Sequence, residues 1–355
     1  MPVTLADIAR ELGVSKMTVS RAINNHPLIN AETRARVLEV ARRLNYKPNQ
    51  YARALATNRS YLIGIVVPDL MNLYFAEVTR AIESVARPAG FQILICSTEE
   101  DPTRELGEVE TLLQRTDGLI ISSVLPPTET KAYRKMVKGG ARIVLVDRTM
   151  INLRCPAVAT DNIQVGRLAT DHLIKLGHRR IGHLQGDASS VSAERLEGYR
   201  QALVMRKLRY DAALVRPCGL LESEGYEAMR AWLAAGDVPD AIFAVNDPTA
   251  IGAMKALEEA GLQVGQDVAL VGAGNIHYGD MLRVPLTTVS WSRGEMGEQA
   301  AHLLLQLIED KSPAAKTQQI ILPPELVVRN SCGAQPVVRA KTKVASGAKR
   351  YALRR

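Results

Sequence analysis

Residues 4–24 read TLADIARELGVSKMTVSRAIN, and this stretch decides how the N-terminal part of the chain folds. Thr4 stands where a helix N-cap is expected, and Asp7 follows at the spacing of a capping box. Apolar residues then recur at three- and four-residue intervals, which predicts an amphipathic helix. Gly13 favours the positive φ that ends a helix, and Ser15 suits the N-cap of a second one. Two short helices joined in this way form a helix-turn-helix.

The outward face of the predicted second helix carries side chains that can read DNA. Lys16, Met17 and Arg21 fall opposite its apolar positions. The second helix of such a motif enters the major groove, where Arg binds guanine bidentately and Lys reaches a guanine or a phosphate. Met17 suits a thymine methyl group, whereas Thr18 and Ser20 are predicted to contact phosphates. The alternative is a helical hairpin of an ordinary α-rich domain, but the agreement of caps, turn and face polarity favours DNA binding.

Two further segments complete the N-terminal region. Asn30 is placed to cap a third helix, whose apolar face would close a small three-helix core. Residues 46–57, YKPNQYARALAT, predict a short Ala-rich helix that is marginal in water by itself. Ala52 and Leu55 share an apolar face with nothing local to bury it. This face could be a wedge for a DNA minor groove or part of a flexible linker, and the residues leave both interpretations open.

Positive charge is concentrated at the two ends of the 355-residue chain, whose formal net charge is +8. Residues 1–60 contain ten Lys or Arg against four Asp or Glu, and residues 331–355 contain seven against none. Basic ends on a mildly acidic body indicate a polyanionic partner. The tail, residues 333–355, has no apolar periodicity and is predicted to be disordered. It either adds salt-sensitive attraction to DNA or has no function.

The composition predicts a globular cytoplasmic protein of two or three domains. A hydrophobic content of 46% with only 4% aromatic residues indicates a large aliphatic core. The four cysteines are far apart in the sequence and form no C-x-x-C, so neither a zinc ribbon nor a disulfide framework is indicated. The N-terminus lacks a signal segment, and no apolar run reaches the length of about 18 residues that a membrane span needs. No membrane partner is expected.

From Tyr61 onward the hydrophobic pattern becomes that of alternating strands and helices. Apolar runs such as LIGIVV (62–67) and AIFAV (241–245) fit buried strands, and amphipathic segments such as FAEVTRAIESVA (75–86) separate them. This alternation predicts an α/β fold of parallel sheets covered by helices on both faces. About ten strands are too many for one sheet, so two doubly wound subdomains are expected. The cleft outside the strand carboxyl ends is the expected ligand site.

These features together resemble the lac repressor (LacI/GalR-type) family of bacterial regulators. The resemblance rests on the head (4–24), on the hinge segment YKPNQYARALA (46–56), and on body segments such as HLIKLGHRRIGHLQG (172–186) and SAERLEGYRQAL (192–203). It covers about residues 3–330. It implies a periplasmic-binding-protein-like body behind a DNA-binding head. The implied domains are a helix-turn-helix head at 1–46, a hinge at 47–59, a body at 60–332 and the tail at 333–355, with an N-subdomain of about 60–160 and 290–322 and a C-subdomain of about 161–289 and 323–332.

The resemblance also implies a function. The expected protein is a sequence-specific DNA-binding transcriptional repressor that binds a pseudo-palindromic operator on double-stranded DNA as a homodimer. A small-molecule effector, a sugar or sugar derivative, would bind in the cleft between the subdomains and control DNA binding. The alternative is a cytoplasmic sugar-binding module without operator specificity. Neither function needs a cofactor, a metal ion or catalysis.

The family's DNA-binding positions carry over residue by residue. Lys16, Met17 and Arg21 would read bases, and Ala52 and Leu55 would form the minor-groove hinge with Leu55 as the wedge. The full set of DNA-binding candidates is Thr4, Ser15, Lys16, Met17, Thr18, Ser20, Arg21, Asn24, Tyr46, Asn49, Ala52 and Leu55.

The family's effector-binding positions carry over in the same way. Tyr74 and Phe75 would flank a small ligand, and Asp147, Arg195 and Asn246 would hydrogen-bond it. The planar fork of Arg195 suits a pair of hydroxyls, a carboxylate or a phosphate. The full set of effector-binding candidates is Asn72, Tyr74, Phe75, Asp147, Asp161, Arg195, Asn246, Asn275 and Trp291.

One wall of the implied pocket departs from the family pattern. Family members carry an aromatic-Asp-Asp or aromatic-Asp-Asn sequence where this chain has Ala273, Gly274 and Asn275. Gly274 therefore replaces the carboxylate that usually clamps a sugar hydroxyl. Trp291 falls where the family often has a polar residue, and it could stack on a sugar ring or shield the pocket wall. These changes leave the identity of the effector open.

Motifs for other functions fail on inspection. The sequence VALVGAGNIHYG (268–279) suggests a dinucleotide site, but His277 stands where the third small residue belongs. His172, His178 and His183 lack metal-ligand spacing with a fourth ligand, so structural roles are expected. No G-x-S-x-G, S-x-x-K or H-E-x-x-H occurs, and no enzyme activity is predicted.

Overall fold

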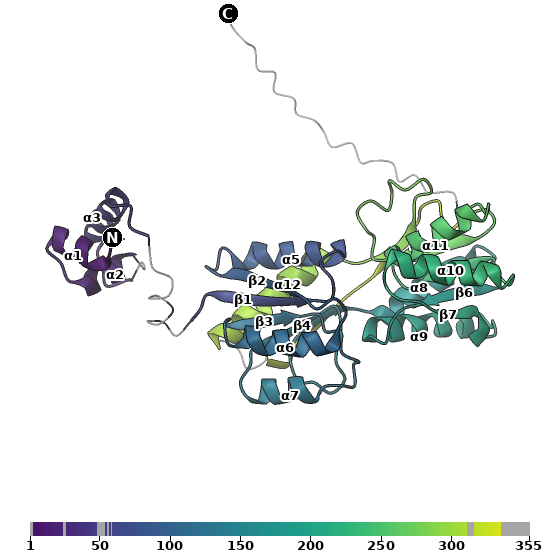
Figure 1. Cartoon of the computed structure of the whole chain (residues 1–355), viewed down its shortest axis with the longest axis horizontal. Helices are drawn as coiled ribbons and strands as arrows, with labels where there is room; N and C mark the ends of the chain where they lie inside the picture. The colour runs from purple at the N-terminus through teal and green to yellow at the C-terminus, as the bar shows by residue number, and fades with distance from the viewer. Residues whose placement is uncertain are drawn as a thin grey trace, which may run out of the picture. The chain divides into compact units, whose positions relative to one another are not determined.

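The computed structural model describes residues 3–23, 26–47, 54, 57, 59–310 and 316–334. The chain divides into two compact units, Met1–Tyr61 and Leu62–Arg355 (Figure 1). The first unit is called the head and the second the body. Four predicted DNA-binding positions lie outside the described residues, as do most of the predicted hinge and the tail from residue 335. These four positions are Asn24, Asn49, Ala52 and Leu55.

The head contains the predicted helix-turn-helix and third helix. Its helices among the described residues are α1 (Leu5–Leu12), α2 (Lys16–Ile23) and α3 (Ala31–Arg43). The Asp7 carboxylate accepts hydrogen bonds from the Thr4 backbone (2.9 Å) and hydroxyl (2.7 Å) at the start of α1. Gly13 ends α1 at φ +66°, and the Ser15 hydroxyl accepts from the Thr18 backbone at 3.0 Å. The predicted caps and turn of the motif are therefore confirmed.

The three head helices enclose one small core. Ile8 and Val19, one from each of the first two helices, are fully buried against Val37 of α3. Ala9 is also buried, where a larger side chain would hold α1 and α2 apart. Because the core uses one face of α2, the opposite face of that helix remains available to a partner.

The body contains two six-stranded sheets, as expected for two doubly wound subdomains. The first sheet, with order β11-β5-β4-β3-β1-β2, is parallel throughout. Its strands are β1 (Leu62–Val67), β2 (Gln92–Ser97), β3 (Gly118–Ile121), β4 (Ile143–Val146), β5 (Ala157–Thr160) and β11 (Gln319–Leu322). The helices that cover it are α5 (Leu73–Ala86), α6 (Pro102–Leu113), α7 (Lys131–Lys138) and α12 (Arg293–Glu309). Ile63 and Ile65 face the core under α5 and α12, whereas Val66 faces the core under α6, so helices cover both faces (Figure 1).

The second sheet has the order β12-β10-β9-β8-β6-β7. Its strands are β6 (Ile181–Gln185), β7 (Val215–Pro217), β8 (Ala241–Ala244), β9 (Ala269–Ala273), β10 (Thr287–Ser290) and β12 (Glu325–Val327). Helices α8 (Asn162–Lys175), α9 (Ser190–Met205), α10 (Glu222–Ala234) and α11 (Asp247–Glu259) cover it, and a 3-10 turn, η1 (Ala212–Leu214), precedes β7. The sheet differs from the expectation of parallel strands at its edge, because β12 runs antiparallel to β10.

The chain passes between the two sheets three times, after β5, after β10 and between β11 and β12. We call the part built on the first sheet the first lobe and the part built on the second sheet the second lobe. Elements of the first lobe occupy residues 62–160 and 293–322, and elements of the second occupy residues 162–290 and 325–327. This arrangement leaves the carboxyl ends of the strands facing a cleft between the lobes, where open α/β sheets bind ligands.

Candidate functional site

The exposed face of α2 carries the three predicted base-reading residues. Lys16, Met17 and Arg21 are exposed, and the Met17 side chain is 62% accessible although it is apolar. Within the described part of the chain, neither Lys16 nor Arg21 forms an ion pair. Two cations and an apolar side chain on one helix face, opposite the buried Val19, can contact phosphates, guanine edges and thymine methyl groups.

The other predicted DNA-binding residues of the head have structural roles in addition to any contact with DNA. Thr4 is engaged in the cap of α1, and the Ser15 and Thr18 hydroxyls lie 2.9 Å apart in a hydrogen bond. Tyr46 packs against the head core, and Ser20 is half-buried. Their roles toward DNA stay predictions.

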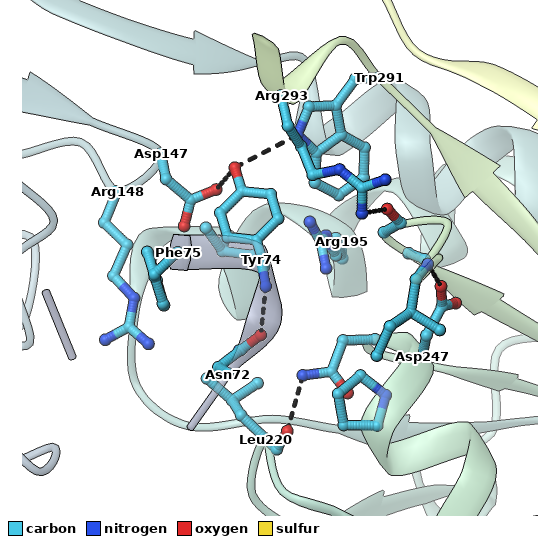
Figure 2. A pocket seen from close by; sticks show the side chains of 16 residues that line it. Asn72, Tyr74, Phe75, Asp147, Arg148, Arg195, Leu220, Asp247, Trp291 and Arg293 are labelled. Atoms are coloured by element: carbon cyan, nitrogen blue, oxygen red, sulfur yellow. Dashed lines mark hydrogen bonds between the residues drawn. The ribbon is translucent and has the colours of Figure 1, made fainter. Parts of the chain in front are cut away.

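A cavity of about 70 Å³ lies between the lobes of the body (Figure 2). Seven of the nine predicted effector-binding residues line it: Asn72, Tyr74, Phe75, Asp147, Arg195, Asn246 and Trp291. Asp161 and Asn275 are absent from the lining. The Asp161 carboxylate instead caps α8 by accepting from the Gln164 backbone, and the Asn275 side chain bonds Ser290 and Arg329.

Tyr74, Asp147 and Trp291 form one hydrogen-bonded cluster on the cavity wall. The Tyr74 hydroxyl donates to the Asp147 carboxylate at 2.7 Å and accepts from the Trp291 indole at 3.3 Å (Figure 2). Burial raises the pKa of Asp147, and burial together with the Asp147 charge raises the pKa of Tyr74. Asp147 stands directly after β4 at φ +65°, a conformation that turns the chain sharply at the end of the strand.

Arg195, which comes from α9, is the buried cation of the cavity. Its side chain donates to Asn162 at 3.0 Å and to the Val245 carbonyl at 2.6 Å, and its guanidinium lies 5.0 Å from the Trp291 ring centre. It is 3% exposed and forms no ion pair with any described residue. Burial lowers its pKa. A ligand with hydroxyl or anionic oxygens could satisfy the guanidinium hydrogens that these bonds leave free.

Three charged residues that line the cavity were missed in the sequence. They are Arg148, Asp247 and Arg293. Arg148 makes a bidentate bond to Glu100 at 2.9 and 3.0 Å and lies 3.7 Å from Asp187 of the second lobe. Burial opposes its charge, but these two carboxylates outweigh burial and raise its pKa. The only signal for Arg148 was its place directly after Asp147 at a strand end.

Asp247 supplies a carboxylate close to the position where the family pattern lacks one. Its two oxygens accept from the Thr288 hydroxyl at 2.6 Å and from the Ile276 backbone at 2.7 Å. A Cβ placed on Gly274 would lie 3.7 Å from the second oxygen, so this carboxylate sits directly beneath Gly274. Burial raises its pKa. The cavity therefore borders two buried carboxylates, Asp147 and Asp247.

Asn246 lines the cavity, but most of its hydrogen-bonding groups already bond other residues of the protein. Its amide donates to the Leu220 carbonyl at 2.8 Å, and its oxygen caps α11 by accepting from the Thr249 backbone at 2.8 Å. Leu220 itself lines the cavity. One amide hydrogen of Asn246 is left for a ligand.

The described residues contain no group of three or more potential metal ligands. The three clustered histidines face different partners: His172 lies 3.2 Å from the Cys332 sulfur, His178 lies 3.1 Å from Asp240, and His183 lies 2.9 Å from the Phe243 carbonyl. All four cysteines are free thiols. Among the described helices, none is both long and apolar enough to cross a bilayer.

Comparison with known proteins identifies the family. Residues 4–49 match the pattern of bacterial regulatory proteins of the lacI family, and residues 170–332 match a periplasmic binding protein-like domain. The chain is 33% identical to an HTH-type transcriptional repressor PurR of Mannheimia succiniciproducens, over 92% of this chain and 98% of that protein. It is 35% identical to the HTH-type transcriptional regulator DegA of Bacillus subtilis, over 93% and 98%.

A solved structure agrees with these relatives. The lac repressor dimer bound to operator and the anti-inducer ONPF superposes with a TM-score of 0.83 at 30% identity, covering 94% of this chain and 100% of that one. The relatives match nearly their whole length, head and body together, and they are regulators rather than enzymes. The chain therefore belongs to the lacI family of bacterial regulatory proteins, and it is a DNA-binding transcriptional regulator with an effector-binding body rather than an enzyme.

Proposed function

We propose that this regulator is a repressor that binds a pseudo-palindromic operator as a homodimer. A small molecule bound between the lobes of its body raises or lowers its affinity for that operator. The observation that carries the proposal is the exposed face of α2, with Lys16, Met17 and Arg21 presented on a helix whose other face is fixed in the head core. A rigid, cationic helix face of this kind fits the DNA major groove.

The roles in DNA binding follow from side-chain chemistry. Arg21 reads a guanine through its O6 and N7 atoms, Lys16 binds a guanine or a phosphate, and Met17 contacts a thymine methyl group or a pyrimidine edge. Further hydroxyl and amide groups within residues 4–49 position α2 on phosphates without reading sequence. The positioning group consists of Thr4, Ser15, Thr18, Ser20, Asn24, Tyr46 and Asn49. Ala52 and Leu55 form the minor-groove hinge, with Leu55 as the wedge.

The effector is a small polar molecule, and a sugar or sugar derivative fits the cavity chemistry best. Asp147 supplies an acceptor and Arg195 a donor from opposite lobes, so adjacent hydroxyls of a ligand could bond both. The indole ring of Trp291 offers an apolar face beside them, as sugar rings require. A ligand that bonds groups of both lobes changes the balance between open and closed bodies, and a different affinity for the two states is what allows it to control DNA binding.

Exposed apolar residues support a homodimer through the first lobe. Met71 is 86% exposed just before α5, with Leu70 and Leu73 beside it in the sequence. Ile95 is 44% exposed on β2, which is an edge strand. Solitary exposed apolar side chains are ordinary, but several on neighbouring elements mark an interaction surface. Two heads brought together in this way could read two half-sites about one helical turn apart.

The proposed operator places the protein in the bacterial cytoplasm, where the chromosomal DNA is. A sugar-binding module without operator specificity remains the competing function, since the cavity alone would serve it. The two functions differ in one property, because only a regulator discriminates between duplex sequences by several kcal/mol.

Selection of duplexes from a random pool by the full chain tests the proposal. We expect enrichment of a sequence with two inverted half-sites, bound by two chains per duplex. The matched control replaces Arg21 by Ala and should enrich a site that is degenerate at one position of each half. If the wild-type chain enriches no palindrome at moderate salt, the proposed operator function is wrong.

A further inference from the structure

Arg293 connects the two lobes across the effector cavity. It begins α12 in the first lobe, and its Nε atom lies 3.0 Å from a carboxylate oxygen of Glu77 on α5 of the same lobe. Its two terminal nitrogens reach into the second lobe. One donates to the Gly274 carbonyl at 2.8 Å (Figure 2), and the other donates to the Asn275 carbonyl at 2.9 Å. One planar group therefore bonds both lobes at once, with each of its three nitrogens engaged.

The acceptors of Arg293 form a rigid socket. Gly274 has φ +128° and Asn275 has φ +52°, and these conformations turn two successive carbonyls toward the same guanidinium. The Asn275 side chain is fixed by Arg329 at 2.7 Å and by Ser290 at 3.2 Å, and the next residue, Ile276, donates to Asp247. Only glycine adopts φ +128° without strain, so the Gly274 that departs from the family pattern is what this socket requires.

The position of this contact makes it suited to control rather than to ligand recognition. Arg293 lines the cavity, but its bonds leave it little capacity for a ligand, in contrast to Arg195. Because Arg293 bonds both lobes, a movement that separates them at this point has to break some of its bonds.

We propose that Arg293 is a positioning residue of the regulatory switch, a clasp that holds the two lobes in one relative arrangement and is released when they move apart. The inference rests on the proposed function, because it assigns a regulatory step to the same cavity. Loss of the clasp shifts the body toward the open state without any effector, and the lobe movement passes to DNA binding by the same coupling that the effector uses.

Acrylamide quenching of Trp291 fluorescence measures the open population directly. The chain has two tryptophans, so Trp232→Phe in the full chain leaves Trp291, which is 6% exposed in the closed cleft, as the single reporter. Arg293→Lys keeps the charge beside Glu77 but cannot bond both carbonyls, and we expect its quenching constant to rise by about threefold. Glu77→Gln removes only the anchor in the first lobe and should give a smaller rise. Arg230→Lys, at an exposed position of α10, is the matched control and should behave as the parent.

The wild-type background provides a second measurement if Trp232→Phe unfolds. Trp232 is 1% exposed in the core of the second lobe, so it adds a fluorescence that acrylamide does not reach. Quenching that is unchanged in both Arg293→Lys and Glu77→Gln would overturn the clasp.

DNA affinity separates a regulatory role from a merely structural one. With the duplex enriched from the random pool, Arg293→Lys should change the dissociation constant by about fivefold or more, in either direction, while Arg230→Lys leaves it unchanged. Raised quenching with unchanged affinity would show a local contact only and overturn the inference. A wild-type chain that enriches no duplex would instead overturn the proposed function and this inference with it.

Discussion

Replacing His183 by Phe should reduce the acid sensitivity of the second lobe. His183 lies in β6, fully buried between Tyr199 and Phe243, whose ring centres are 5.3 and 4.8 Å away. Burial lowers its pKa from 6.5 to about 4, assisted by the charges of Arg195 and Arg200 and opposed by the bond to the Phe243 carbonyl. Its Nε2 atom has no partner within the described structure. The folded protein therefore holds a neutral imidazole that the unfolded chain would protonate more readily.

The sign and size of the effect follow from this difference. Because the folded pKa is below the unfolded one, the unfolded state binds the proton first as the pH falls below 6.5, and stability is lost until the pH passes the folded pKa of about 4. The whole shift corresponds to about 3 kcal/mol, and the part between about pH 7.5 and about pH 5 to about 2 kcal/mol. Phe keeps the aromatic stack and does not titrate, so the variant should lose about 2 kcal/mol less over that interval than the wild type does.

Urea unfolding of the full chain, followed by tryptophan fluorescence at the two pH values, measures this difference. Carboxylates and the other histidines titrate in both proteins and cancel in the comparison. His302→Gln, at an exposed position, is the matched control and should keep the wild-type pH dependence. Equal losses of stability in His183→Phe and wild type would refute a buried neutral His183.

Two further predictions concern the functional surfaces. Arg21→Ala should cost about 1–3 kcal/mol of discrimination at one base pair of each half-site, measured by competition with singly substituted duplexes. Arg10→Ala on α1 is the control and should leave discrimination intact. Identical base preferences in Arg21→Ala and wild type would show that Arg21 does not read a base. Arg195→Met should abolish the thermal shift caused by any ligand found in a screen of sugars and sugar acids, yet retain operator binding. A variant whose thermal shift equals that of the wild type would show that the ligand does not bind the buried guanidinium.

Strongly patterned elements of this chain were predictable from sequence, and weakly patterned ones were not. The capping box at Thr4, the Gly13 turn and the apolar stripe of α1 specify the head because local chemistry and core packing agree there. Strand β8 has only four residues but was recognised from its apolar run. Strands β5, β7, β10, β11 and β12, with three or four residues each, include polar residues and show no such run. The reversed direction of β12 depends on a tertiary path that no local pattern encodes.

The residues of the cavity were also only partly predictable from the sequence. Tyr74, Asp147 and Arg195 were found through the family resemblance, which carries positions over without knowing their bonds. Asn275 was assigned to the ligand, but the fold uses its side chain to fix the loop after β9. Arg148 and Arg293 were overlooked because a charged residue in sequence is ordinarily read as exposed, and only the fold brings Glu100 and Glu77 to them.

A crystal structure of the full chain with the duplex it selects tests the central claim most directly. The account predicts two protomers on one duplex, each with α2 in the major groove and with Lys16, Met17 and Arg21 against base edges of one half-site. A complex in which that face of α2 points away from the bases, while another surface of the chain holds the DNA, would contradict it.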